Sequence, residues 1–165
     1  MRVRQIDELS LSEFADLSHK GSSIWLIDIS TIPYHLGFSV DGKYYSLKFH
    51  GKDEAIPVSS LLKRLNRTSK ALAFIPLNVG VSQNYVDQVF GRYTSCVEND
   101  CSCIRPILEL FGFEQQKEWT LKNLLESLDL AGQLSNVYGI NLPKGVVELE
   151  EYDYAVVEAN LNKPV

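Results

Sequence analysis

Residue types that can carry nucleophilic chemistry stand in two separate stretches of the chain. Residues 99–112 contain Cys101 and Cys103, followed by Pro106 and an apolar run that ends at Gly112. Proline is tolerated in the first turn of a helix, where its missing N–H would be unpaired anyway. We therefore expect a helix that begins near Cys103. The free N–H groups and the positive end of a helix dipole favour an anion, so the position predicts a thiol pKa lowered toward thiolate.

A thiol nucleophile needs a base, and the second stretch, residues 32–50, contains two of the three histidines, His35 and His50. Asp41-Gly42 is a preferred two-residue turn, and its flanks are rich in aromatic and β-branched residues. This pattern predicts a hairpin. Because side chains alternate along a strand, we expect His35 on one face of the first strand and His50 on one face of the second.

Taken together, this order of parts resembles the circularly permuted papain-like fold of the NlpC-like amidase and lecithin retinol acyltransferase group. The shared parts are a histidine on a strand, a D-G hairpin and a later cysteine that opens a helix ending in glycine, over roughly residues 24 to 112. The resemblance implies that Cys103 is the nucleophile, that His35 is the general base and that His50 orients His35. It implies a cysteine hydrolase or acyltransferase that acts without a cofactor, through an acyl-enzyme, on a peptide, glycopeptide or lipid ester.

Two features of the residues keep alternatives open. Cys101 competes with Cys103 for the place of the nucleophile, although a helix beginning at Cys101 would put Pro106 beyond the first turn. Lys48 stands close to the orienting position, and its ammonium group cannot accept the imidazole N–H. The principal alternative is therefore a non-catalytic binding or interaction protein of the same fold. A third is a scaffold domain whose thiols are buried, as free cysteines commonly are.

Composition and charge exclude several classes of function. The chain has 165 residues, of which 45% are hydrophobic, and this predicts a single domain over residues 1–165. A net charge of −5 gives no basic footprint for nucleic acid or for an anionic membrane. The apolar runs are far shorter than the ~20 residues of a membrane span.

The cysteines and the N-terminus bear on metal binding and location. The C-x₄-C-x-C spacing of Cys96, Cys101 and Cys103 matches no common metal site, and we expect no metal. Three cysteines without a disulfide pattern favour a reduced, cytoplasmic setting. The first residues lack the apolar region of a secretion signal, and a signal that has been removed is also compatible with the sequence.

The order of strand and helix patterns around these residues predicts an α+β fold. We expect an antiparallel sheet around the hairpin, with helices packed on it. Apolar spacing predicts further strands at 23–29 and 71–77 and helices near 9–17, 57–65 and 120–130. Residues 78–95 have no clear period, which indicates a loop with a short helix. Two closing strands are expected at 146–149 and 154–157.

Overall fold

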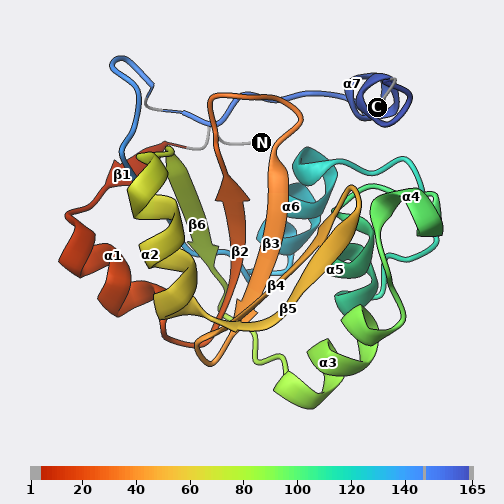
Figure 1. Ribbon diagram of the computed structural model, residues 1–165, viewed down its shortest axis with the longest axis horizontal. Coiled ribbons are helices and arrows are strands. Elements are labelled where there is room, and N and C mark those ends of the chain that lie inside the picture. Colours follow the sequence, from red (N-terminus) through yellow and green to blue (C-terminus); the bar gives the residue numbers. More distant parts are fainter. Residues whose placement is uncertain (1–4, 147, 164–165) are drawn as a thin grey trace.

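The computed structural model describes residues 5–146 and 148–163 of the chain. Within these residues seven strands form one sheet, in the order β1-β7-β6-β2-β3-β4-β5 (Figure 1). The edge pair β1 and β7 is parallel, and the other neighbouring pairs are antiparallel. The α+β class is confirmed, with one parallel pair in a sheet expected to be antiparallel. The strands are β1 (Ile6–Glu8), β2 (Ser22–Ile27), β3 (His35–Val40), β4 (Lys43–Lys48), β5 (Gly51–Pro57), β6 (Leu72–Pro76) and β7 (Val137–Ile140).

Helices cover both faces of this sheet (Figure 1). Apolar residues of α1 and α2 form a core with one face, and those of α3, α5 and α6 form a core with the other. In α2 the buried residues Val58, Leu61, Leu62 and Leu65 follow helical spacing, so a single apolar stripe attaches the helix to the sheet. The helices are α1 (Leu11–Ser18), α2 (Val58–Thr68), α3 (Gln83–Gly91), α4 (Cys96–Asn99), α5 (Arg105–Leu110), α6 (Leu121–Leu130) and α7 (Tyr154–Leu161).

The predicted hairpin is confirmed as β3 and β4. Its turn residues, Asp41 and Gly42, have φ values of 48° and 78°, the positive angles that a type I′ turn requires. The two strands pair from Val40↔Lys43 to Phe38↔Tyr45. Beyond that point the far end of β4 continues its pairing with β5, and β3 continues with β2. The hairpin is therefore closed at its turn and separates toward His35.

Alternation along β3 sends its side chains into the two different cores. Leu36 and Phe38 belong to the core beneath α3, α5 and α6. His35 pairs with Ile27, and Gly37 pairs with Trp25, and both partners belong to the core beneath α1 and α2. Because paired residues of antiparallel strands share a face, His35 lies on the α2 side of the sheet.

Several predicted elements differ from the structure. Residues 154–157, expected to be a strand, form the first half of α7, which Asp153 caps by accepting a hydrogen bond from the Ala155 amide. The strand expected at 146–149 includes Val147, which lies outside the described residues, and Glu148 forms a single bridge with Gln5. Strands β1, β5 and β7 and helix α4 were not expected from the periodicity. Strands β1 and β7 and helix α4 have three or four residues, too few for a clear period. Strand β5 is longer, but its polar sequence GKDEAIP has no apolar alternation.

None of the helices in the described part of the chain is both long and apolar enough to cross a membrane.

A candidate binding cavity beside Cys103

Cys103 contacts the backbone of β3 at the place where the hairpin opens. Its sulfur accepts a hydrogen bond from the Leu36 amide, with N···S 3.4 Å, and donates to the Tyr34 carbonyl, with S···O 3.7 Å. In a regular antiparallel ladder these two groups would bond to the neighbouring strand. The thiol therefore occupies hydrogen-bonding positions that β4 leaves vacant.

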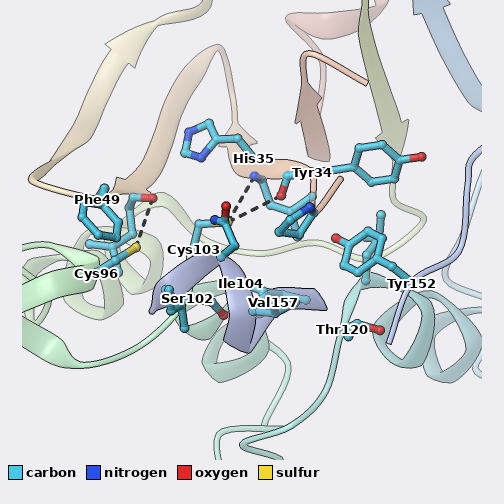
Figure 2. Close-up of a pocket in the computed structure, with 16 residues that line it drawn as sticks. Tyr34, His35, Phe49, Cys96, Ser102, Cys103, Ile104, Thr120, Tyr152 and Val157 are labelled. Atoms are coloured by element: carbon cyan, nitrogen blue, oxygen red, sulfur yellow. Dashed lines mark hydrogen bonds between the residues drawn. The ribbon is translucent and has the colours of Figure 1, made fainter. Parts of the chain in front are cut away.

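The open end of β4 is satisfied in the same way by helix α4. The Cys96 thiol lies 3.9 Å from the Leu47 carbonyl, and the Val97 amide donates to the Phe49 carbonyl over 3.1 Å. Ser95 caps this helix by accepting from the Glu98 amide. Helix α4 and the residues that follow it thus act as a wedge that keeps β3 and β4 apart (Figure 2).

The turn between α4 and α5 sets the position of Cys103. Asp100 ends α4 in the left-handed conformation, with φ 48°, and reverses the chain toward the sheet. Helix α5 then begins at Arg105, with Ile104 at the N-cap and Pro106 in the first turn. The prediction of a helix beginning near Cys103 was close, but Cys103 precedes the N-cap. The helix has six residues and no side-chain cap, so its dipole is small at the sulfur.

A cavity of about 150 Å³ lies in the space that the wedge creates. Figure 2 shows Tyr34, Cys103, Ile104, Thr120, Tyr152 and Val157 around it. Its wall is mostly apolar, and the polar groups come from residues such as Ser102, Thr120 and Asn160. Among the described residues that line it, none is Asp, Glu, Lys or Arg.

The C-terminal segment closes this cavity from the outside. The Glu150 amide donates to the Tyr34 hydroxyl over 2.7 Å, and the Tyr152 ring packs edge-on against the Tyr34 ring at 5.5 Å between centroids. Val157 is the buried residue of α7 and forms part of the wall. These contacts hold 148–161 against the cavity, although α7 has few buried residues of its own.

His35 does not face Cys103. Its imidazole lies on the α2 side of β3, while the sulfur lies on the α5 side, and Figure 2 shows the ring directed away from the sulfur. The expectation that these two side chains form a nucleophile and base pair is wrong, because adjacent positions of a strand point to opposite faces and Cys103 reaches the backbone of residues 34 and 36.

The surroundings of His35 are charged. Burial lowers the pKa of its imidazole, the Asp53 carboxylate acts in the opposite direction, and Lys48 adds to the lowering. Asp53 is itself buried and accepts hydrogen bonds from Lys48 and Arg64, each at 3.2 Å, and from Ser46 at 3.4 Å. Burial acts to raise the pKa of Asp53, but the two cations outweigh it and the pKa is lowered.

His50 is not an orienting residue for His35. Strand β4 ends at Lys48, and His50 is exposed in the turn that leads to β5, with its ring packed edge-on against Phe49 at 4.8 Å between centroids. The expectation that His50 continues the strand is wrong. Lys48, noted in the sequence as a residue that cannot accept an imidazole N–H, instead pairs with Asp53.

The thiols have raised rather than lowered pKa values. Burial raises the pKa of Cys103, and the Leu36 amide opposes this without reversing it. Burial also raises the pKa of Cys96 to about 12 and that of Cys101 to about 11. This direction is opposite to the thiolate expected at Cys103, because enclosure of the sulfur favours the neutral thiol. The alternative nucleophile Cys101 is also protonated at neutral pH.

Sequence reasoning missed the most strongly connected polar residue, Asp53, and the cavity wall formed by Tyr152 and Val157. Asp53 stands in the polar run 51–54, which has the composition of an exposed turn. The β-bulge between β4 and β5 turns the Asp53 side chain inward, and the local sequence does not predict this bulge. No three His, Cys, Asp or Glu residues of the described chain come together as metal ligands.

Comparison of the chain with protein-family models, with curated proteins and with solved structures finds no match. The resemblance to the permuted papain-like group therefore stays a prediction.

Proposed function

We propose that the chain is a non-catalytic binding module, and that the cavity beside Cys103 receives a small uncharged ligand or an apolar side chain of a partner. The observation that carries this proposal is the wedge: two thiols and one amide satisfy the open hairpin, so the space between its strands is maintained without strand pairing. Buried polar backbone groups are costly when unpaired, and their satisfaction allows the cavity to persist.

The chemistry of the wall supports an uncharged ligand. Most of the lining is apolar, and its polar side chains carry hydroxyl, amide and thiol groups. His35 also lines the space, but its ring is directed away from Cys103 (Figure 2). A carboxylate or ammonium group there would lose its hydration without an ion partner. Apolar cavities of about 150 Å³ hold molecules of the size of benzene. The expected ligand is therefore a small aromatic or short aliphatic group.

The geometry favours this proposal over acyl transfer through Cys103. A protonated thiol that donates to the Tyr34 carbonyl is a weak nucleophile, and the imidazole expected to activate it faces the other side of β3. Both requirements of the cysteine hydrolase or acyltransferase interpretation are thus unsupported.

Titration of the ¹⁵N-labelled protein with phenol tests the proposal. Saturable shifts are expected at the amides of Leu36, Leu121 and Val157, which surround the cavity. Butanoate, of similar size but charged, is expected to give no such shifts. Val157→Phe should remove the phenol response by filling the space, whereas Val156→Phe, on the neighbouring residue outside the wall, should keep it.

Two results would contradict the proposal. Phenol shifts spread over the surface, and equal in both phenylalanine variants, would show that the cavity is not a binding site. Hydrolysis of a nitrophenyl ester by the wild-type chain, lost in Cys103→Ser, would restore the acyl-enzyme interpretation.

A further inference from the structure

The basic residues of the chain are concentrated in one segment. Residues 43–70 contain seven of the 16 lysines and arginines but two of the 21 aspartates and glutamates. The net charge of this segment is +5, whereas the rest of the chain has −10. The overall charge of −5 is therefore an average over two unlike regions, and it conceals a local positive surface.

Most cations of this segment lie on β4, on α2 or just after α2. Five exposed side chains form what we call the basic surface: Lys48, Lys63, Arg64, Arg67 and Lys70. Residues 63 and 67 are one helical turn apart, as are 64 and 67, so these side chains are neighbours on α2. Lys48 and Arg64 both bind the Asp53 carboxylate at 3.2 Å, which brings the end of β4 beside α2, and Lys70 follows the end of α2 by two residues.

The acidic groups of the segment do not neutralise this surface. Asp53 is shared between Lys48 and Arg64, and Glu54 pairs with Lys52 at 3.0 Å. Among the described residues, no carboxylate forms an ion pair with Lys63, Arg67 or Lys70. In the described structure these three positive charges are therefore available to an external anion.

The form of the surface favours carboxylates of a protein over nucleic acid. Binding of single-stranded nucleic acid uses exposed aromatic side chains on which bases stack. Within residues 5–146 and 148–163 the large exposed apolar side chains are Leu11, Tyr85, Val97 and Leu130, and none belongs to β4, β5 or α2. A long nucleic acid would also extend beyond the basic surface onto the rest of the protein, which has a net charge of −10 and would repel its phosphates. A short acidic segment fits within the positive area.

We propose that the basic surface of α2 and β4 is a docking site for an acidic segment of another protein. It lies on the α2 side of the sheet, opposite the cavity beside Cys103, and it does not depend on the ligand proposed for that cavity. The attraction comes from several exposed charge pairs, so binding is fast and sensitive to salt.

Fluorescence anisotropy with a labelled polyglutamate peptide of about eight residues tests this proposal at about 50 mM salt. The triple variant Lys63→Glu, Arg67→Glu and Lys70→Glu is expected to weaken binding by about tenfold or more, since attraction becomes repulsion. A matched variant, Lys20→Glu, Lys117→Glu and Lys144→Glu, changes the net charge equally at exposed positions elsewhere. It should weaken binding by about twofold or less.

Three outcomes would overturn the proposal. Equal weakening in the two triple variants would mean that only net charge matters. Tighter binding of an oligothymidylate of matched charge would assign the surface to nucleic acid. Absence of peptide binding by the wild-type chain at low salt would leave no docking site. If the glutamate variant unfolds, the glutamine variants of the same three residues replace it, and they should still weaken binding by about threefold.

Discussion

The two faces of β3 differ in how they satisfy buried polar groups. On the α5 side, thiols and backbone amides complete an opened hairpin around an uncharged cavity. On the α2 side, a buried carboxylate holds two cations, and a half-buried imidazole lies near them. One strand separates the two environments. Neighbouring residues such as His35 and Leu36 therefore experience different chemistry, and closeness in sequence is no guide to a shared site.

The contrast bears on where binding can occur on each side. The α5 side offers a partly enclosed space whose described lining has no Asp, Glu, Lys or Arg, which suits an apolar group. The α2 side presents exposed cations at its rim, which suit an acidic partner surface. Each of the following changes is made on one of these two faces.

The largest effect is expected from Gly37→Ala, on the α2 side. A Cβ at this position would overlap the Tyr44 hydroxyl oxygen, and Tyr44 is fully buried against Trp25. Overpacking of this kind costs about 1–3 kcal/mol, and more where the neighbour cannot move. Chemical denaturation measures the loss. Gly51→Ala, with open space around its Cβ, serves as the control and should change stability by less than about 1 kcal/mol. A stability loss in Gly37→Ala as small as that in Gly51→Ala would show that the Tyr44 side chain moves aside at little cost.

The second largest effect is expected from Asp53→Asn, because Lys48 and Arg64 lose their shared carboxylate. Both cations are partly exposed to water, which limits the loss of folding stability to about 1–3 kcal/mol near neutral pH. The pKa of Asp53 is lowered in the folded state, so its contribution is present above the unfolded value near 3.8 and is lost as pH falls below it. Denaturation at several pH values should show the two proteins converging in acid. A constant difference down to low pH would contradict the assignment.

Cys103→Ala tests the other face. The Leu36 amide and the Tyr34 carbonyl lose their partner, and an unsatisfied buried group costs about 1–3 kcal/mol. Cys103→Ser keeps a donor and an acceptor and should recover about half of the loss. Hydrogen exchange gives the specific readout, since the Leu36 amide should exchange faster in the alanine variant than in the serine variant. Unchanged exchange would mean that the thiol does not hold the hairpin end.

The pKa of His35 should change with a substitution on the α2 side and not with one at Cys103. NMR of the imidazole is expected to give a pKa below 6.5, because burial lowers it. In Asp53→Asn the pKa should fall further, since the carboxylate raises it. In Cys103→Ser it should stay within about 0.2 units of wild type. A clear shift in the cysteine variant would place the two groups in contact and remove the distinction between the faces.

The smallest effect concerns thiol reactivity. At neutral pH iodoacetamide should label all three cysteines slowly, because burial raises their pKa values, and denaturant should accelerate all three. His35→Ala should leave the rate at Cys103 within about twofold of wild type. Rapid labelling of Cys103 that slows in this variant would instead support the catalytic pair.

The local elements near the site follow from the order of residues alone. The Asp41-Gly42 turn specified the hairpin through its positive φ angles, and Pro106 marked the first turn of α5 to within two residues. Leucine spacing specified α6, with Leu121, Leu124, Leu125 and Leu128 buried as expected. These features depend on residues adjacent in the chain, so they are visible before folding.

Which residues share a site depends on the tertiary structure. Period-two alternation says that His35 and Leu36 point to opposite faces, but not which face α5 will cover. Nor does it say that the hairpin opens beyond Phe38 or that Cys103 takes the vacant bonds. The raised thiol pKa values have the same origin, because enclosure by distant segments outweighs a helix terminus beside the sulfur. Desolvation depends on everything packed around a group, and most of those atoms come from elsewhere in the chain.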